Sequence, residues 1–202
     1  MIAIGRYLGK DEDTSYLIGM GKIFALFLIG FMVAAGTAAA DQDDQRLDDL
    51  FIQLRSTSDL DQANKIQRDI WVIWIEGKTA EVNTVMARGI DEMNVGDYPA
   101  ALRYFSDVVD LTPELAEGWN KRATVLYLMG DYDGSVRDIQ KTLALEPRHW
   151  GALSGLGLIN MRLERVDQAI KAFEQAVTIN PHLLGTKVRI KQLRAISKGK
   201  PT

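Results

Sequence analysis

Along residues 116–149, the apolar positions fall on two helical stripes that are separated by a sharp break. Trp119, Ala123 and Leu126 recur three or four positions apart, which predicts a helix with one side facing a core. A second stripe of the same kind is centred on Ile139. The pattern therefore predicts two short amphipathic helices in succession.

Residue types at the ends of these stripes define a turn and a stop. Gly130 suits the end of the first helix, and Asp131 suits the cap of the next one. Pro147 ends the second helix, because proline cannot continue a helix and disfavours helical geometry in the residue before it. Residues 116–149 are thus expected to form a helical hairpin.

The hairpin pattern repeats. Pro113, Pro147 and Pro181 are spaced 34 residues apart and close three blocks, 82–115, 116–149 and 150–183. A fixed period of this length indicates stacked supersecondary units. Each block carries a turn sequence in its middle and a small residue followed four positions later by a large apolar one. The turns are Gly96-Asp97-Tyr98, Gly130-Asp131-Tyr132 and Glu164-Arg165-Val166, and the pairs are Ala101 and Phe105, Ser135 and Ile139, and Ala169 and Phe173.

This period and pattern resemble the tetratricopeptide repeat family, whose signature combines W-x2-L-G-x2-Y, A-x3-F and a closing proline. Block two keeps Trp119, and block three keeps Leu156 and Gly157. The resemblance implies an all-α solenoid of antiparallel helix hairpins. It also implies a concave binding surface and no built-in catalytic apparatus.

Segments on both sides of the three repeats fit the same architecture. Residues 41–80 predict a degenerate N-terminal hairpin, with helices over 43–55 and 59–75, packed against block one. In residues 184–202, Val188, Leu193 and Ile196 stand among basic residues, which predicts a capping helix, apolar inside and charged outside, followed by a tail. Four hairpins and one cap give nine expected helices.

Residues 1–40 predict a leader with a secretory signal peptide. The apolar run 23–33 is followed by Ala38-Ala39-Ala40, so cleavage is expected after Ala40. The alternative is an uncleaved anchor formed by residues 23–40. Because an acidic run cancels the first basic residues, Met20 is a better start for this signal than Met1, which remains the alternative.

Composition narrows the functional classes. The chain has 202 residues, no cysteine and a formal net charge of -3. Disulfides, thiolate metal sites and cysteine nucleophiles are therefore excluded. The charge argues against a nucleic-acid binder. Membrane contact is expected only through an uncleaved signal or the basic tail.

Candidate chemistry is sparse. Gly151, Gly155 and Gly157 match no phosphate-loop spacing, so their expected role is close helix packing. His149 and His182 lie one period apart, without the partners of a metal site, and are expected to be solvated. The sequence predicts no catalytic residue, no cofactor and no metal, and hence a protein that is not an enzyme.

If the resemblance holds, the first helix of each block lines the concave face. Two of its positions, Met86 and Ile90, carry apolar residues where a carboxylate clamp of this family needs lysine and asparagine. An apolar or amphipathic protein segment is therefore the expected ligand, with Asn83, Asn120 and Arg162 fixing its register. The predicted partner-binding residues are Asn83, Met86, Ile90, Met93, Asn120, Thr124, Tyr127, Ser154, Leu158, Met161 and Arg162.

A second candidate surface is the uninterrupted apolar run 70–75. Six consecutive apolar residues exceed what one helix face can bury, so Trp71 or Trp74 is a candidate anchor for a partner. The alternative is that both side chains are buried between the degenerate hairpin and block one.

These observations predict an exported, periplasmic scaffold that binds a protein or peptide and serves the assembly or maintenance of the cell envelope. The alternative is an accessory subunit that positions a catalytic partner in an envelope enzyme complex.

Overall fold

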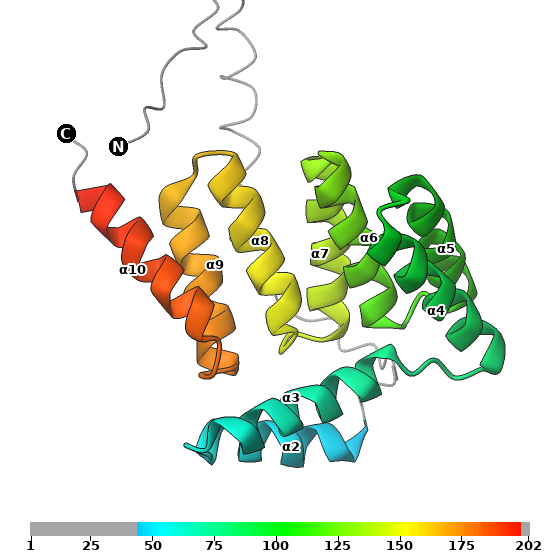
Figure 1. Cartoon of the computed structure of the whole chain (residues 1–202), viewed down its shortest axis with the longest axis horizontal. Helices are drawn as coiled ribbons and strands as arrows, with labels where there is room; N and C mark the ends of the chain where they lie inside the picture. Colours follow the sequence, from blue (N-terminus) through cyan, green and yellow to red (C-terminus); the bar gives the residue numbers. More distant parts are fainter. Residues whose placement is uncertain (1–43, 199–202) are drawn as a thin grey trace, which may run out of the picture. The chain divides into compact units, whose positions relative to one another are not determined.

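The computed structural model describes residues 44–198, and the predicted leader lies outside them. Within these residues the chain forms nine α-helices and no strand, as expected (Figure 1). Each predicted block is one antiparallel helix pair. The helices are α2 (Gln45–Ser56), α3 (Leu60–Ile75), α4 (Ala80–Val95), α5 (Tyr98–Leu111), α6 (Ala116–Met129), α7 (Tyr132–Leu145), α8 (Trp150–Arg162), α9 (Val166–Ile179) and α10 (Leu184–Lys198).

Glycine and aspartate make the turns inside the first two repeats. Gly96 and Gly130 end α4 and α6 with φ angles of 85° and 86°, a left-handed geometry that glycine adopts without strain. Asp97 and Asp131 then cap the next helix by accepting hydrogen bonds from backbone N–H groups. In the third repeat Glu164 takes a positive φ of 56° in place of glycine.

Glycines also let the two helices of a repeat approach each other. A Cβ atom on Gly89 would lie 2.6 Å from the ring of Phe105, and one on Gly157 would lie 2.4 Å from the ring of Phe173. Both rings are buried. The expectation that glycines of block three serve close packing therefore holds at Gly157.

The helix pairs α4–α5, α6–α7 and α8–α9 follow one another, and α10 packs on α9 (Figure 1). Ile190 and Leu193 of α10 are buried against Phe173. Val188 and Ile196 are instead 56% and 54% exposed, so the outer face of the capping helix is partly apolar. This corrects the expectation of a purely charged exterior.

Trp119 is not the core residue that its spacing predicts. Its ring is half-buried beneath the guanidinium group of Arg122, 4.8 Å from the ring centroid. Its indole Nε1 donates to the carbonyl oxygen of Pro113 at 2.8 Å. Arg122 also binds the Asp138 carboxylate through Nε and Nη2, at 2.7 and 2.9 Å, which ties α6 to α7.

The α2–α3 hairpin packs in an unexpected place. Figure 1 shows the two helices side by side, below the ends of α6 to α9. Their apolar faces, which include Phe51 and Trp74, share one core with Trp150 and Leu153 of the third repeat. Only Ile75 packs against the core of block one. The predicted contact with block one is therefore wrong for most of the hairpin.

Polar contacts fix the hairpin to the inter-repeat loops. Arg148 donates to the Asp48 carboxylate at 2.5 Å. Asn180 donates through its amide to Gln67 at 2.9 Å. His182 Nε2 lies 2.9 Å from the carbonyl oxygen of Leu54, a residue in α2.

Among residues 44–198, no helix combines the length and hydropathy needed to cross a bilayer.

Candidate binding groove

Five of the predicted partner-binding residues surround one cavity. This α6–α8 cavity has a volume of about 160 Å³ and lies between the first helices of the second and third repeats, with α7 as its floor. The predicted residues that line it are Asn120, Thr124, Tyr127, Ser154 and Leu158. The remaining lining residues are Ala123, Ser135, Ile139, Gly151 and Gly155.

Two of the hydroxyl groups in the lining are already used within the fold. Thr124 donates its hydroxyl hydrogen to the carbonyl oxygen of Asn120 at 2.9 Å, and Ser135 donates to Ala123 at 2.7 Å. Because both hydrogens are used within the fold, these hydroxyls offer a ligand only acceptor capacity. The aliphatic side chains of Ile139 and Leu158 complete an environment suited to an apolar group.

A cation stands beside the cavity. Arg162 is exposed, and its Nε donates to the phenolic oxygen of Tyr127 at 3.3 Å. This hydrogen bond raises the pKa of Arg162, so the side chain keeps its charge. Met161, the preceding predicted residue, is 36% exposed. The end of α8 therefore presents a positive group and an accessible methionine.

Block one contributes less than predicted. Met86 is 1% exposed and packs with Phe105 in the core, so it is not available to a partner. Ile90 and Met93 are half-buried against the same core. Asn83 is exposed, but its side chain accepts from the Gly77 N–H at 2.7 Å and holds the loop before α4.

Asn120 belongs to a buried polar cluster rather than to an open surface. Its amide donates to the Glu117 carboxylate at 2.9 Å. Lys121 Nζ approaches the other carboxylate oxygen at 3.2 Å, and Glu117 itself is fully buried. Burial alone would raise the pKa of Glu117, but the hydrogen bond from His149 and the charge of Lys121 hold that pKa below its ordinary value.

His149 is the second buried member of this cluster, which corrects its expected solvated role. Its Nδ1 accepts the N–H of Ala152 at 3.0 Å and caps α8. Its Nε2 lies 2.8 Å from Glu117 Oε2. Because Nδ1 accepts, we assign the hydrogen to Nε2, which donates it to the carboxylate. The imidazole also stacks on Trp74, with centroids 4.2 Å apart.

Neither tryptophan of the second candidate patch is freely exposed. Trp74 is 2% exposed and belongs to the core, so it is not a partner anchor. Trp71 is half-buried, with Lys121 Nζ 5.5 Å from its ring centroid. A Cβ atom on Gly151 would lie 3.0 Å from the Trp71 ring. Trp71 therefore packs close to Gly151, which lines the α6–α8 cavity.

Comparison with known proteins decides the family. A model of the tetratricopeptide repeat family matches residues 86–135 and 120–183. A repeat-containing protein of the same kind from Rhizobium etli is 37% identical over 143 residues, which is 71% of this chain and 70% of that protein. The chain belongs to the tetratricopeptide repeat (TPR) family. Membership makes it a protein-interaction scaffold.

Solved TPR structures share the fold. The first TPR domain of Spaghetti, bound to an HSP90 peptide, superposes with a TM-score of 0.56 at 16% identity, covering 58% of this chain and 94% of that one. MamA superposes with a TM-score of 0.55 at 20% identity, covering 73% and 84%. The Hsp70-Hsp90 organizing protein 2 of Arabidopsis thaliana is 29% identical over 55% of this chain, but the match spans only 20% of that protein.

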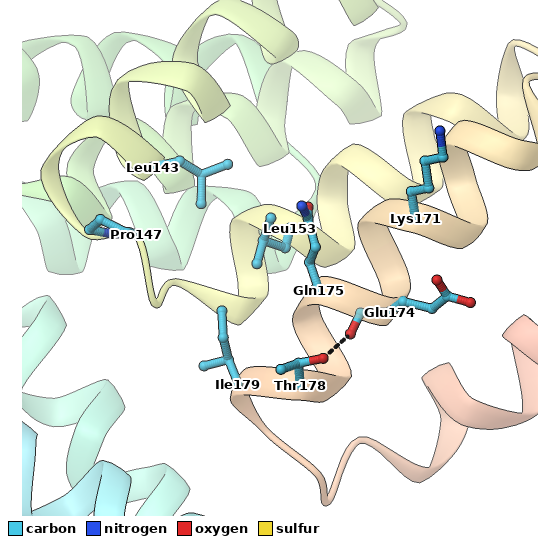
Figure 2. A pocket seen from close by; sticks show the side chains of 8 residues that line it. All are labelled: Leu143, Pro147, Leu153, Lys171, Glu174, Gln175, Thr178 and Ile179. Atoms are coloured by element: carbon cyan, nitrogen blue, oxygen red, sulfur yellow. Dashed lines mark hydrogen bonds between the residues drawn. The ribbon is translucent and has the colours of Figure 1, made fainter. Parts of the chain in front are cut away.

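A larger hollow, of about 670 Å³, lies between α7, α8 and α9 of the TPR stack (Figure 2). Leu143, Leu153 and Ile179 form its apolar part, and Lys171 and Glu174 stand at its edge. The sequence gives no signal for this hollow, because its apolar residues have the spacing of core positions.

Within residues 44–198, no three histidine or acidic residues are grouped so as to hold a metal ion.

Proposed function

We propose that this chain is an exported TPR scaffold that binds an apolar or amphipathic segment of a cell-envelope protein through the α6–α8 cavity. One observation carries the proposal: side chains from two successive first helices, α6 and α8, meet around a single opening beside an exposed cation. The TPR domain of Spaghetti, which shares this fold and is bound to an HSP90 peptide, supports peptide binding as the role of the fold.

Energetics favour an apolar ligand group at this place. Leu158 and the Tyr127 ring are only half-buried, so they lose further contact with water when a partner arrives. Each 100 Å² of apolar surface removed from water contributes about 2.5 kcal/mol before the costs of association. Arg162 supplies orientation, since its guanidinium group attracts a carboxylate in the same segment.

Export is the second part of the proposal, and it rests on the leader described above. The expected mature protein begins at Asp41 and lacks the apolar run 23–33. N-terminal sequencing of the protein recovered from the cell envelope tests this part. A membrane-bound product that retains residues 23–33 would favour the anchor instead.

Binding is tested by capture from envelope extracts with matched variants. Leu158→Glu combined with Arg162→Glu places negative charge at the cavity and removes the cation. We expect the double variant to lose a partner that the natural protein retains. Leu158 also packs against the core around Phe173, so Arg162→Glu alone, at an exposed side chain, is the variant whose melting temperature should change little. Retention of every partner by the double variant would remove the α6–α8 cavity from the function. The matched control is Gln140→Glu with Arg137→Glu, both exposed on α7.

A further inference from the structure

Three glycines of α8 serve different purposes. Gly157 is needed for packing, since a Cβ atom there would collide with Phe173 at 2.4 Å. Gly151 is tightly placed, because a Cβ atom would lie 3.0 Å from the ring of Trp71. At Gly155 a Cβ atom would meet only the Cδ1 atom of Ile139, at 3.5 Å, which is an ordinary contact. Packing therefore does not require a glycine at position 155.

Glycine at this position also weakens the helix. It lies in the middle of α8, where glycine is the poorest helix former apart from proline. Gly155 lines the α6–α8 cavity and is half-exposed. A side chain here would project into the opening between α6 and α8. The one evident consequence of the missing side chain is thus the open cavity.

We propose that Gly155 is a specificity-determining residue, which keeps the α6–α8 cavity open for one large apolar side chain of the bound segment. This inference rests on the proposed function and names what the site accepts. The volume of about 160 Å³ suits such a group. For comparison, a cavity of about 150 Å³ lined by aliphatic and aromatic side chains holds benzene. Leucine, methionine and phenylalanine are the side chains of this size and polarity.

The charge beside the cavity predicts which residue lies next to that apolar side chain in the bound segment. Arg162 is exposed and reaches Tyr127, which lines the cavity. The carboxylate of Glu117 is fully buried and is already paired with Lys121. The cavity therefore has positive charge at its side, and the matching segment carries an aspartate or glutamate side chain adjacent to its large apolar residue.

The test begins with a phage-displayed library of random dodecapeptides selected on the full chain. We expect the selected peptides to share a large apolar residue beside an acidic one. One selected peptide, labelled with a fluorophore, is then titrated by fluorescence anisotropy against the natural protein, Gly155→Met, Gly155→Ala and Gly185→Met. Gly185 is the matched control, since a Cβ atom on it would meet no other atom within 4 Å and it lies in α10.

Filling the cavity should weaken binding without harming the fold. Gly155→Met is expected to raise the dissociation constant by roughly tenfold or more, the scale at which an apolar pocket discriminates by size. Gly155→Ala should have a smaller effect in the same direction. Both variants should melt about 2–4 °C higher than the natural protein, because helix propensity improves. Gly185→Met should leave the affinity unchanged.

Contrary outcomes are distinct. If the Arg162→Glu variant no longer binds the peptide while the Gly155→Met variant binds it normally, the role of Gly155 is refuted. The groove would then still bind segments as proposed. A fall in the melting temperature of Gly155→Ala would refute that role as well, since Gly155 would then be a packing glycine like Gly157. If no peptide is selected, or if binding ignores both Arg162→Glu and Leu158→Glu, the proposed function fails together with this inference.

Discussion

His149 Nε2 and Glu117 Oε2 lie 2.8 Å apart, and neither side chain is exposed to solvent. The pair joins the first helix of the second repeat to the residue that caps α8, the first helix of the third repeat. Trp74 of α3 stacks on the imidazole, so the same histidine also contacts the N-terminal hairpin. His149 thus connects three parts of the fold that are far apart in the sequence.

Removing this histidine should destabilise the protein severely. His149→Ala leaves the Glu117 carboxylate buried without one of its donors and removes the cap of α8, so we expect a loss of about 3–5 kcal/mol of unfolding free energy. His149→Asn can still cap the helix and should cost less. Urea denaturation of both variants measures the difference. Equal losses would mean that capping contributes nothing.

Glu117 should make stability depend on acid. Its pKa in the folded state is lowered from an ordinary value of 4.5, so its ionised form contributes stability above that value. The contribution is lost as the pH falls through the folded pKa. We expect Glu117→Gln to be about 1–3 kcal/mol less stable at pH 7, with the gap closing below about pH 4.5. A difference in unfolding free energy that stays constant with pH would contradict an ionised Glu117.

Glu164 offers a stabilising substitution. A residue with a side chain costs about 1–2 kcal/mol in left-handed geometry, while glycine costs about 0.5–1 kcal/mol in chain entropy. Glu164→Gly should therefore raise the unfolding free energy by up to about 1 kcal/mol. The mirror substitution, Gly130→Glu, should lower it by a similar amount. Thermal denaturation of the two variants provides the check, and shifts of the same sign would disprove the account.

The two tryptophans of the first helices should behave differently. Trp150 is 3% exposed and contacts Phe51 and Trp74, so Trp150→Ala should cost about 3–5 kcal/mol. Trp119 is half-buried and makes one hydrogen bond to the backbone, so Trp119→Ala should cost only about 1 kcal/mol. Chemical denaturation compares them directly. Similar losses would place Trp119 in the core after all.

Much of the fold can be predicted from the sequence, because the residues that specify it act locally. Gly130, Asp131 and Pro147 specify a turn, a cap and a stop through backbone geometry that needs no knowledge of distant contacts. The period of the three prolines then identifies the stack. The fold class and the hairpins follow from these signals alone.

Features that depend on distant contacts could not be predicted in the same way. The uninterrupted apolar run 70–75 leaves open whether Trp74 is buried or exposed, because the surface that buries it lies far away in the sequence. The polarity of His149 predicts a solvated side chain, although His149 and Glu117 hydrogen-bond to each other inside the protein. Met86 matched a groove position by alignment, yet the neighbouring Phe105 makes it part of the core.

The central claim is that a partner occupies the α6–α8 cavity, and site-specific photo-crosslinking in cells tests it most directly. A photoreactive amino acid is placed at Leu158 in the cavity, at Thr178 in the hollow between α7 and α9, or at exposed Gln140 on α7. The account predicts a crosslinked protein from position 158 and none from position 140. A partner crosslinked from position 178 and not from position 158 would contradict the account.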